Sequence, residues 1–201
     1  MKTITTSLEK KHFPVMLSEV IQRCLPIKNN HLIVDCTFGG GGYSKELLKF
    51  SNIKVVALDR DKDAISRAKN LKKNFPKQFN FYNEKFSNLD RILKKENKPD
   101  VIIFDLGLST FQLKDYSRGF SFKSEEKIDM QMGLSEISAE DVINTADEKN
   151  LKLIIKILGE EKEANRITRN IIKARAVKKI TTVTELVRII ELSKKKIIIK
   201  K

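Results

Sequence analysis

The chain has 201 residues, of which 40% are hydrophobic and 33% are charged, with a formal net charge of +14 at pH 7. This length allows one hydrophobic core and at most a small second domain. No apolar run reaches membrane-spanning length, and the N-terminus lacks the apolar stretch of a secretory signal. Two cysteines without metal-ligand spacing favour a reducing compartment. We therefore expect a globular, cytoplasmic protein that binds no membrane and no metal.

The first two-thirds of the sequence alternates between signals for helices and strands. Helices are expected at 16–25, 44–50, 62–73 and 87–95, and strands at 32–35, 55–59, 79–82 and 101–104. Continuous apolar strands with helices between them predict an α/β fold whose parallel sheet is buried on both faces. Four strands alone would leave an open apolar edge on such a sheet.

After Gly119 the sequence becomes helical. Helices are expected at 138–146, 148–158, 160–177 and 182–193. A capping box is predicted from Thr182 to Glu185. In the second of these helices one apolar face is predicted, formed by Leu151, Ile154, Ile155 and Leu158. This part of the chain is expected to form a helical subdomain.

The positive charge is concentrated near the C-terminus. Residues 151–201 contain 15 Lys or Arg and 5 Glu, a balance of +10, whereas residues 1–150 carry 25 minus 21, or +4. Cations on these helices would attract a polyanion and contact its phosphates without reading sequence. The alternative is a solvated helix face. The candidate cations are Lys156, Arg166, Arg169, Lys173, Arg175, Lys178 and Lys179.

Four consecutive glycines, 39–42, follow the expected strand 32–35. Such a turn brings backbone N–H groups close to a nucleotide-like ligand. Asp59 follows Gly39 by twenty residues, at the end of the next strand, where a carboxylate can accept hydrogen bonds from a ribose. Ser44 replaces the third glycine of a dinucleotide fingerprint, and no phosphate-binding lysine loop is present. S-adenosylmethionine therefore fits best, and the alternative is a tight turn with Asp59 as a helix cap.

Three aspartates, Asp35, Asp59 and Asp105, lie at strand ends, where ligands bind in open α/β sheets. Ser109 and Gln112 follow Asp105 and could line the same pocket. The alternative for these two residues is helix capping or a surface position.

Six segments in order closely resemble the bacterial ribosomal RNA small-subunit methyltransferase H family, also called MraW. The segments are 12–19, 35–44, 57–61, 104–113, 118–122 and 128–132, and the similarity runs from about His12 to Leu192. The resemblance implies a Rossmann-like class I S-adenosylmethionine-dependent methyltransferase sheet, incomplete here, with an inserted all-helical subdomain. It also implies N4-methylation of a cytidine in the decoding region of 16S rRNA on the small ribosomal subunit, by a monomer or homodimer.

The resemblance further implies the domains and the site. A cofactor-binding methyltransferase core is expected at 1–133, a helical RNA-recognition subdomain at 134–193 and a basic tail at 194–201. Asp105 is the expected catalytic residue. The expected contacts to S-adenosylmethionine are Gly41, Gly42, Tyr43, Asp59, Phe86, Asp105 and Gln112.

Two other hypotheses stay open. Later sheet segments of the family, similar to His-Pro-Ala-Thr-Arg and Ser-Phe-His-Ser-Leu-Glu, are not found in this sequence, and Gln131 stands where the family usually has arginine. The chain could thus be a truncated, catalytically impaired relative that still binds S-adenosylmethionine or RNA. A nucleotide-dependent oxidoreductase is the third hypothesis, which the missing third glycine disfavours.

Overall fold

The computed structural model describes residues 14–25, 30–94 and 98–194. The chain forms two compact units, the first comprising Met1–Thr110 and Met132–Leu134, the second Phe111–Gln131 and Ser135–Lys201. The boundaries of these units differ from those of the domains expected from the sequence. The expected domain boundary after residue 133 stays a prediction. Residues 195–201 of the expected tail lie outside the described residues.

The first unit contains a parallel sheet of four strands. The strands are β1 (His31–Asp35), β2 (Ile53–Leu58), β3 (Phe79–Tyr82) and β4 (Val101–Ile103), in the order β3-β2-β1-β4. The helices between them are α1 (Leu17–Arg23), α2 (Gly42–Leu47), α3 (Ala64–Asn74), the 3₁₀ turn η1 (Phe86–Asn88) and α4 (Leu89–Leu93). The sheet and its helices confirm the predicted α/β fold with Rossmann-like winding.

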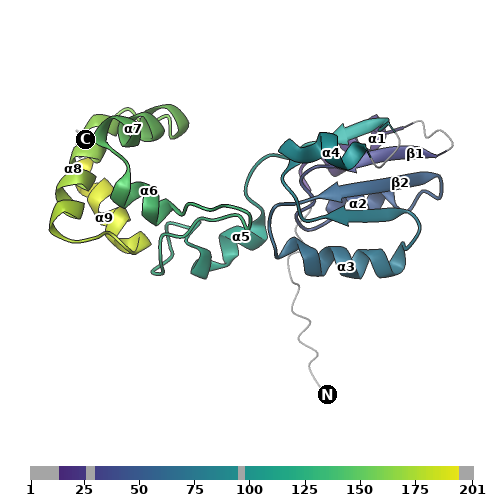
Figure 1. Cartoon of the computed structure of the whole chain (residues 1–201), viewed down its shortest axis with the longest axis horizontal. Coiled ribbons are helices and arrows are strands. Elements are labelled where there is room, and N and C mark those ends of the chain that lie inside the picture. Colours follow the sequence, from purple (N-terminus) through teal and green to yellow (C-terminus); the bar gives the residue numbers. More distant parts are fainter. Residues whose placement is uncertain (1–13, 26–29, 95–97, 195–201) are drawn as a thin grey trace, which may run out of the picture. The chain divides into compact units, whose positions relative to one another are not determined.

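Helices cover the two faces of this sheet in separate layers (Figure 1). Ile33, Val55 and Phe79 pack on one face against side chains of α1, α2 and α3. Val34 and Val56 pack on the other face against α4. Consecutive residues of β1 and β2 are therefore both buried, which explains why these strands read as continuous apolar runs.

Strand β4 is not buried on both faces, contrary to the prediction. Ile102 is 42% exposed and Phe104, just after the strand, is 50% exposed. β4 pairs only with β1 in the sheet of the described residues, so it forms an edge. The side chains of α4 pack over β1 and β2, and they leave this side of β4 uncovered. Within the described ranges, the side of β4 away from β1 pairs with no other strand, as expected for a sheet of four strands.

The second unit is helical. Its elements are α5 (Thr110–Lys114, which starts at the last residue of the first unit), the 3₁₀ turn η2 (Tyr116–Arg118), α6 (Ala139–Thr145), α7 (Glu148–Leu153), the π-helical turn η3 (Ile154–Leu158), α8 (Ala164–Val177) and α9 (Val183–Ser193). Ile128, Leu151, Ile167, Ile171 and Ile180 form the centre of its core. The predicted helical character of this region is confirmed, whereas α5 and η2 were not predicted.

The predicted apolar face of residues 148–158 is only partly correct. Leu151 is buried and Ile155 packs against the core, but Leu158 is 79% exposed. A π-helical turn begins at Ile154, and the Gly159 amide donates to the Ile154 carbonyl at 3.2 Å, five residues back. A π turn rotates the following side chains away from the α-helical register, so Leu158 leaves the buried face.

Candidate active site at the carboxyl edge of the sheet

The loops after β1, β2 and β4 are tied together by hydrogen bonds at the carboxyl edge of the sheet. The Cys36 amide donates to the Ile103 carbonyl at 2.9 Å, and the Phe38 amide donates to the Leu58 carbonyl at 3.0 Å. The Asp105 amide donates to Thr37 Oγ1 at 2.8 Å. These bonds hold the glycine turn between the ends of β2 and β4, as the parallel sheet predicts.

Asp59 fixes the glycine turn from the end of β2. Its Oδ2 accepts from the Gly39 amide at 2.6 Å and its Oδ1 accepts from the Asp61 amide at 2.8 Å. Burial raises the pKa of Asp59 above its ordinary value, although these two amides act in the opposite direction. Each carboxylate oxygen keeps a second lone pair, so Asp59 can still accept a hydrogen bond from a ligand.

Asp35 lies beneath the turn and is fully buried. Its Oδ2 accepts from Ser44 Oγ at 2.7 Å, and its Oδ1 accepts from the Thr37 amide at 3.3 Å. Burial raises the pKa of Asp35 to about 6, and the charges of Asp59 and Asp105 add to the shift. Asp35 therefore fixes the start of α2 and is not accessible to a ligand.

Asp105 is the exposed carboxylate of the three strand-end aspartates. Its Oδ2 lies 3.3 Å from the hydroxyl of Tyr43, and the Val15 carbonyl lies 2.6 Å from the same hydroxyl. The Tyr43 side chain is buried, and this burial raises its pKa to about 12, so the hydroxyl remains a donor. The hydroxyl has one hydrogen and the Val15 carbonyl is the nearer acceptor, so the contact from Tyr43 to Asp105 is the weaker of the two.

Gly41 and Gly42 are placed where the backbone has no room for side chains. Gly41 caps α2 with φ +76°. A Cβ on Gly42 would lie 2.1 Å from Cγ of Pro14, so the N-terminal segment packs directly on the turn. The predicted cofactor contacts of Gly41, Gly42 and Tyr43 stay predictions, and the structure gives each residue a packing role as well.

Phe86 lies after β3 and is 44% exposed. It packs edge to face against Phe104, with ring centroids 5.5 Å apart and an interplanar angle of 86°. Two half-exposed aromatic rings in contact form an apolar surface that can accept a flat ligand. Phe104 was not predicted as a site residue, because it was assigned to a buried strand.

Gln112 belongs to the second unit and is 8% exposed within α5, so the first unit alone does not assemble the full predicted residue set. Ser109 belongs to the first unit.

Polar side chains that were not predicted from the sequence also stabilise the loops of the site. The Asn83 side-chain amide donates to the Asp59 carbonyl at 2.8 Å, and Arg67 Nε donates to the Gly39 carbonyl at 2.9 Å. Because these partners are far apart in sequence, no local pattern identifies them.

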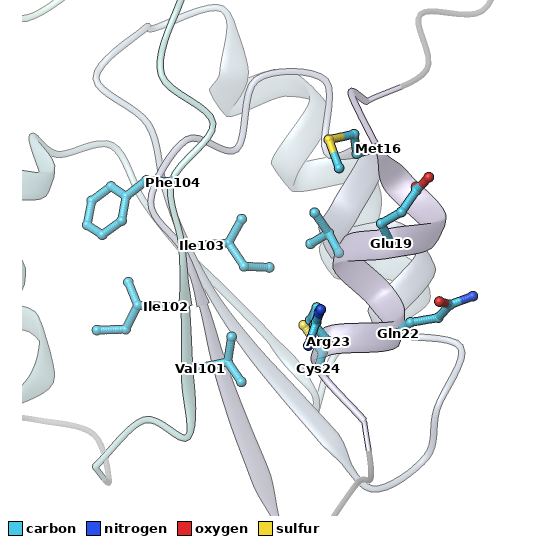
Figure 2. A pocket seen from close by; sticks show the side chains of 10 residues that line it. Met16, Glu19, Gln22, Arg23, Cys24, Val101, Ile102, Ile103 and Phe104 are labelled. Carbon is cyan, nitrogen blue, oxygen red and sulfur yellow. The ribbon is translucent and has the colours of Figure 1, made fainter.

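A groove of about 540 Å³ runs between α1 and the edge strand β4. Figure 2 shows Val101 and Ile103 pointing from β4 towards α1, with Ile102 and Phe104 on the other side of the strand. Glu19 and Arg23 of α1 also line this groove. More than half of the residues that line it are apolar, and none of the three strand-end aspartates is among them.

Among the described residues, no group of three or more His, Cys, Asp or Glu side chains is arranged to hold a metal ion. No helix in the described ranges is both long enough and apolar enough to cross a membrane. The site instead offers carboxylate acceptors and an aromatic pair. This set of groups suits a ligand with hydroxyl groups and a flat ring.

Two comparisons with known proteins point to the same family. The MraW methylase family matches residues 9–199. A ribosomal RNA small subunit methyltransferase H from Orientia tsutsugamushi (strain Ikeda) is 41% identical over 179 residues, which are 89% of this chain and 57% of the relative. The protein of that name from Bartonella tribocorum is 42% identical over 168 residues, 84% of this chain and 49% of the relative.

A solved rRNA methylase from Streptococcus thermophilus is a more distant likeness, with 22% identity and a TM-score of 0.36 over 45% of this chain and 50% of that chain. The chain spans between about half and three-fifths of the length of the curated relatives it matches. The family match covers almost all of the sequence. The chain therefore belongs to the MraW methylase family.

Proposed function

We propose that this chain is an S-adenosylmethionine-dependent methyltransferase that methylates N4 of a cytidine in the decoding region of 16S rRNA. The observation that carries the proposal is the family match over residues 9–199. Relatives about 40% identical are named ribosomal RNA small subunit methyltransferase H. The small ribosomal subunit is accordingly the proposed partner.

The residues at the carboxyl edge fit S-adenosylmethionine. Asp59 has one lone pair left on each oxygen after binding the amides of Gly39 and Asp61, which suits the two hydroxyls of a ribose. The exposed ring of Phe86, supported by Phe104, suits an adenine. In this proposal the glycine turn lies against the methionine portion, because small residues let a ligand approach the backbone.

Asp105 is the proposed catalytic residue. When bound, S-adenosylmethionine supplies an electrophilic methyl group on a sulfonium. The cytidine amino group is a weak nucleophile because its lone pair is delocalised into the ring, so it must be held in line and relieved of a proton. Asp105 is exposed, its amide donates to Thr37 Oγ1, and its carboxylate lies 3.3 Å from the Tyr43 hydroxyl. Its carboxylate can accept the proton that the amino group loses as the new N–C bond forms and the bond between sulfur and the methyl carbon breaks.

A second candidate function is binding without turnover. This chain spans 57% of the Orientia relative's length, and binding and turnover are therefore measured separately. Isothermal titration with S-adenosylmethionine, together with methyl transfer to small ribosomal subunits, separates the two. Transfer of a methyl group to N4 of a cytidine supports the main proposal. Binding without transfer supports the second candidate, and absence of binding contradicts both in their cofactor form.

The variant Asp105→Asn tests the proposed catalytic role. We expect a rate of methyl transfer about 100-fold lower than that of the unmodified chain, the lower end of what a positioned proton acceptor contributes. Asp90→Asn is the matched control, because Asp90 is an exposed residue of α4 with the same change of charge. Circular dichroism confirms that both variants are folded. An unchanged rate in folded Asp105→Asn would remove Asp105 from the mechanism.

A further inference from the structure

Helix α8 separates apolar and cationic residues onto different faces. Its inward face buries Ala164, Ile167, Thr168 and Ile171. Arg166, Arg169 and Lys173 are exposed. At 3.6 residues per turn and 1.5 Å per residue, these three lie within an arc of about 60° and a length of about 10 Å. We call these three side chains the α8 cation stripe.

The structure separates six of the seven candidate cations into two groups of three, and the seventh, Lys156, is exposed in η3. The guanidinium of Arg175 donates to the carbonyls of Ile143 and Ala146, both at 2.7 Å, at the C-terminal end of α6. Two lysines form ion pairs: Lys178 with Glu185 at 2.8 Å, and Lys179 with Glu140 at 2.6 Å. Each of these three cations contacts another helix of the second unit or its C-terminal end, although the side chains of Lys178 and Lys179 are still exposed.

The α8 cation stripe has no such partners. Within the described ranges, none of its members forms an ion pair, and Arg169 Nε donates only to the Asn165 carbonyl, at 3.3 Å. Helix α8 contains no Asp or Glu at all. The N-cap residue Glu163 is a neighbour of Arg166 by helical spacing, but no acidic residue lies between the three cations of the stripe along the helix. Two of its three members are arginines, whose planar guanidinium matches phosphate oxygens through two parallel hydrogen bonds.

We propose that the α8 cation stripe binds the phosphate backbone of the RNA substrate. The choice of RNA as the polyanion rests on the proposed function. Three cations along about 10 Å of helix can contact the phosphates of one strand, and such contacts position an RNA without reading its sequence. The stripe therefore contributes to affinity and orientation, and Asp105 acts on the base.

Two triple variants of the full chain test this surface. The first is Arg166→Gln with Arg169→Gln and Lys173→Gln. The second is Lys69→Gln with Lys73→Gln and Lys77→Gln, which removes the same charge from exposed lysines of the first unit, in and after α3. Binding is measured by fluorescence anisotropy with a fluorescein-labelled RNA of the small-subunit decoding region, without S-adenosylmethionine, over a series of KCl concentrations.

For the stripe variant we expect at least a tenfold loss of RNA affinity at moderate salt. Because each phosphate contact to a single strand contributes about 0.7 to the slope of log K against log[salt], that slope should fall by about 2. The control variant should change the slope by less than 1. Both variants should have the circular dichroism spectrum of the unmodified chain, and peptides of α8 should exchange amide hydrogens as slowly as they do in it, which shows that the second unit is folded.

Equal losses in the two variants would overturn the proposal, since the effect would then be one of net charge. Unchanged binding in the stripe variant, or no RNA binding by the unmodified chain, would also overturn it. Stripe-dependent RNA binding without any methyl transfer would support this inference while contradicting the proposed function. Methyl transfer at the same rate in the stripe variant and the unmodified chain would support the proposed function and contradict this inference.

Discussion

At the scale of single residues, the three strand-end aspartates differ in environment. Asp35 is fully buried, Asp59 is half-buried with both oxygens bound to amides, and Asp105 is exposed. Groups of one chemical type take different roles when their surroundings differ. Asp35 can only support the turn, Asp59 can support it and bind a ligand, and Asp105 is free to face a substrate.

The burial of Asp35 predicts a pH dependence of stability. Its pKa is raised from 3.8 to about 6 in the folded chain. The folded state therefore holds a proton that the unfolded state has lost between these values, so stability falls as pH rises from about 4 to about 6. A shift of this size corresponds to at most about 3 kcal/mol. Below the unfolded pKa the contribution is fully present.

Urea unfolding of the unmodified chain and of Asp35→Asn at pH 4, 5, 6 and 7 checks this. Asparagine has nearly the same shape and no ionisation, so we expect the variant to lose less stability between pH 4 and pH 6. A constant cost of the substitution itself does not affect the comparison of slopes. Parallel pH profiles would show that Asp35 titrates in the folded chain as it does in the unfolded chain.

At the scale of secondary structure, the order and type of the main helices and strands could be predicted from the sequence. Apolar runs, turn residues and the capping pattern at Thr182 are local signals, and these elements depend on them. The exposure of β4 and the π turn at Ile154 were missed. The first depends on which strand α4 covers, and the second on how α7 and α8 pack, and neither is encoded within a few residues.

The capping box of α9 is the local signal that the structure confirms most directly. The Glu185 amide donates to Thr182 Oγ1 at 3.3 Å, and the Thr182 amide donates to Glu185 Oε2 at 3.3 Å. We expect Thr182→Ala to lower the free energy of unfolding of the second unit by about 1 kcal/mol. Thr184→Ala is the matched control, because Thr184 is exposed within the first turn of the same helix.

For both variants, urea unfolding gives the midpoint of the transition, and hydrogen exchange gives the rate at which the amides of α9 exchange. The expected result is a lower midpoint and faster exchange in α9 for Thr182→Ala. A smaller change is expected for Thr184→Ala, since only helix propensity differs there. If the two variants unfold alike, the hydroxyl of Thr182 does not stabilise the helix.

At the scale of the whole molecule, the candidate site could be predicted only in part. The glycine turn with Asp59 and Asp105 was predicted because strand ends of a parallel sheet converge. The contacts that set its shape could not be predicted, such as Pro14 against Gly42 or Thr37 bound to the Asp105 amide. They join loops that approach each other only in the folded sheet.

The division into two units predicts where the proposed cofactor acts. Of the predicted contacts to the cofactor, all but Gln112 belong to the first unit, whereas Gln112 and the α8 cation stripe belong to the second. A ligand that binds only the folded first unit stabilises it by about 2.7 kcal/mol at a concentration 100 times its Kd. If the second unit opens independently of the first, its amides gain no protection from this binding free energy.

Hydrogen exchange with and without S-adenosylmethionine measures this difference. We expect slower exchange in peptides covering 36–44 and 55–61, and no change in peptides of α8 and α9. Adenosine alone serves as a control, because it offers the ribose and adenine but no methionine portion to the glycine turn. Equal protection of both units would contradict the assignment of the cofactor to the first unit, because ligand stabilisation reaches only the amides whose opening destroys the site.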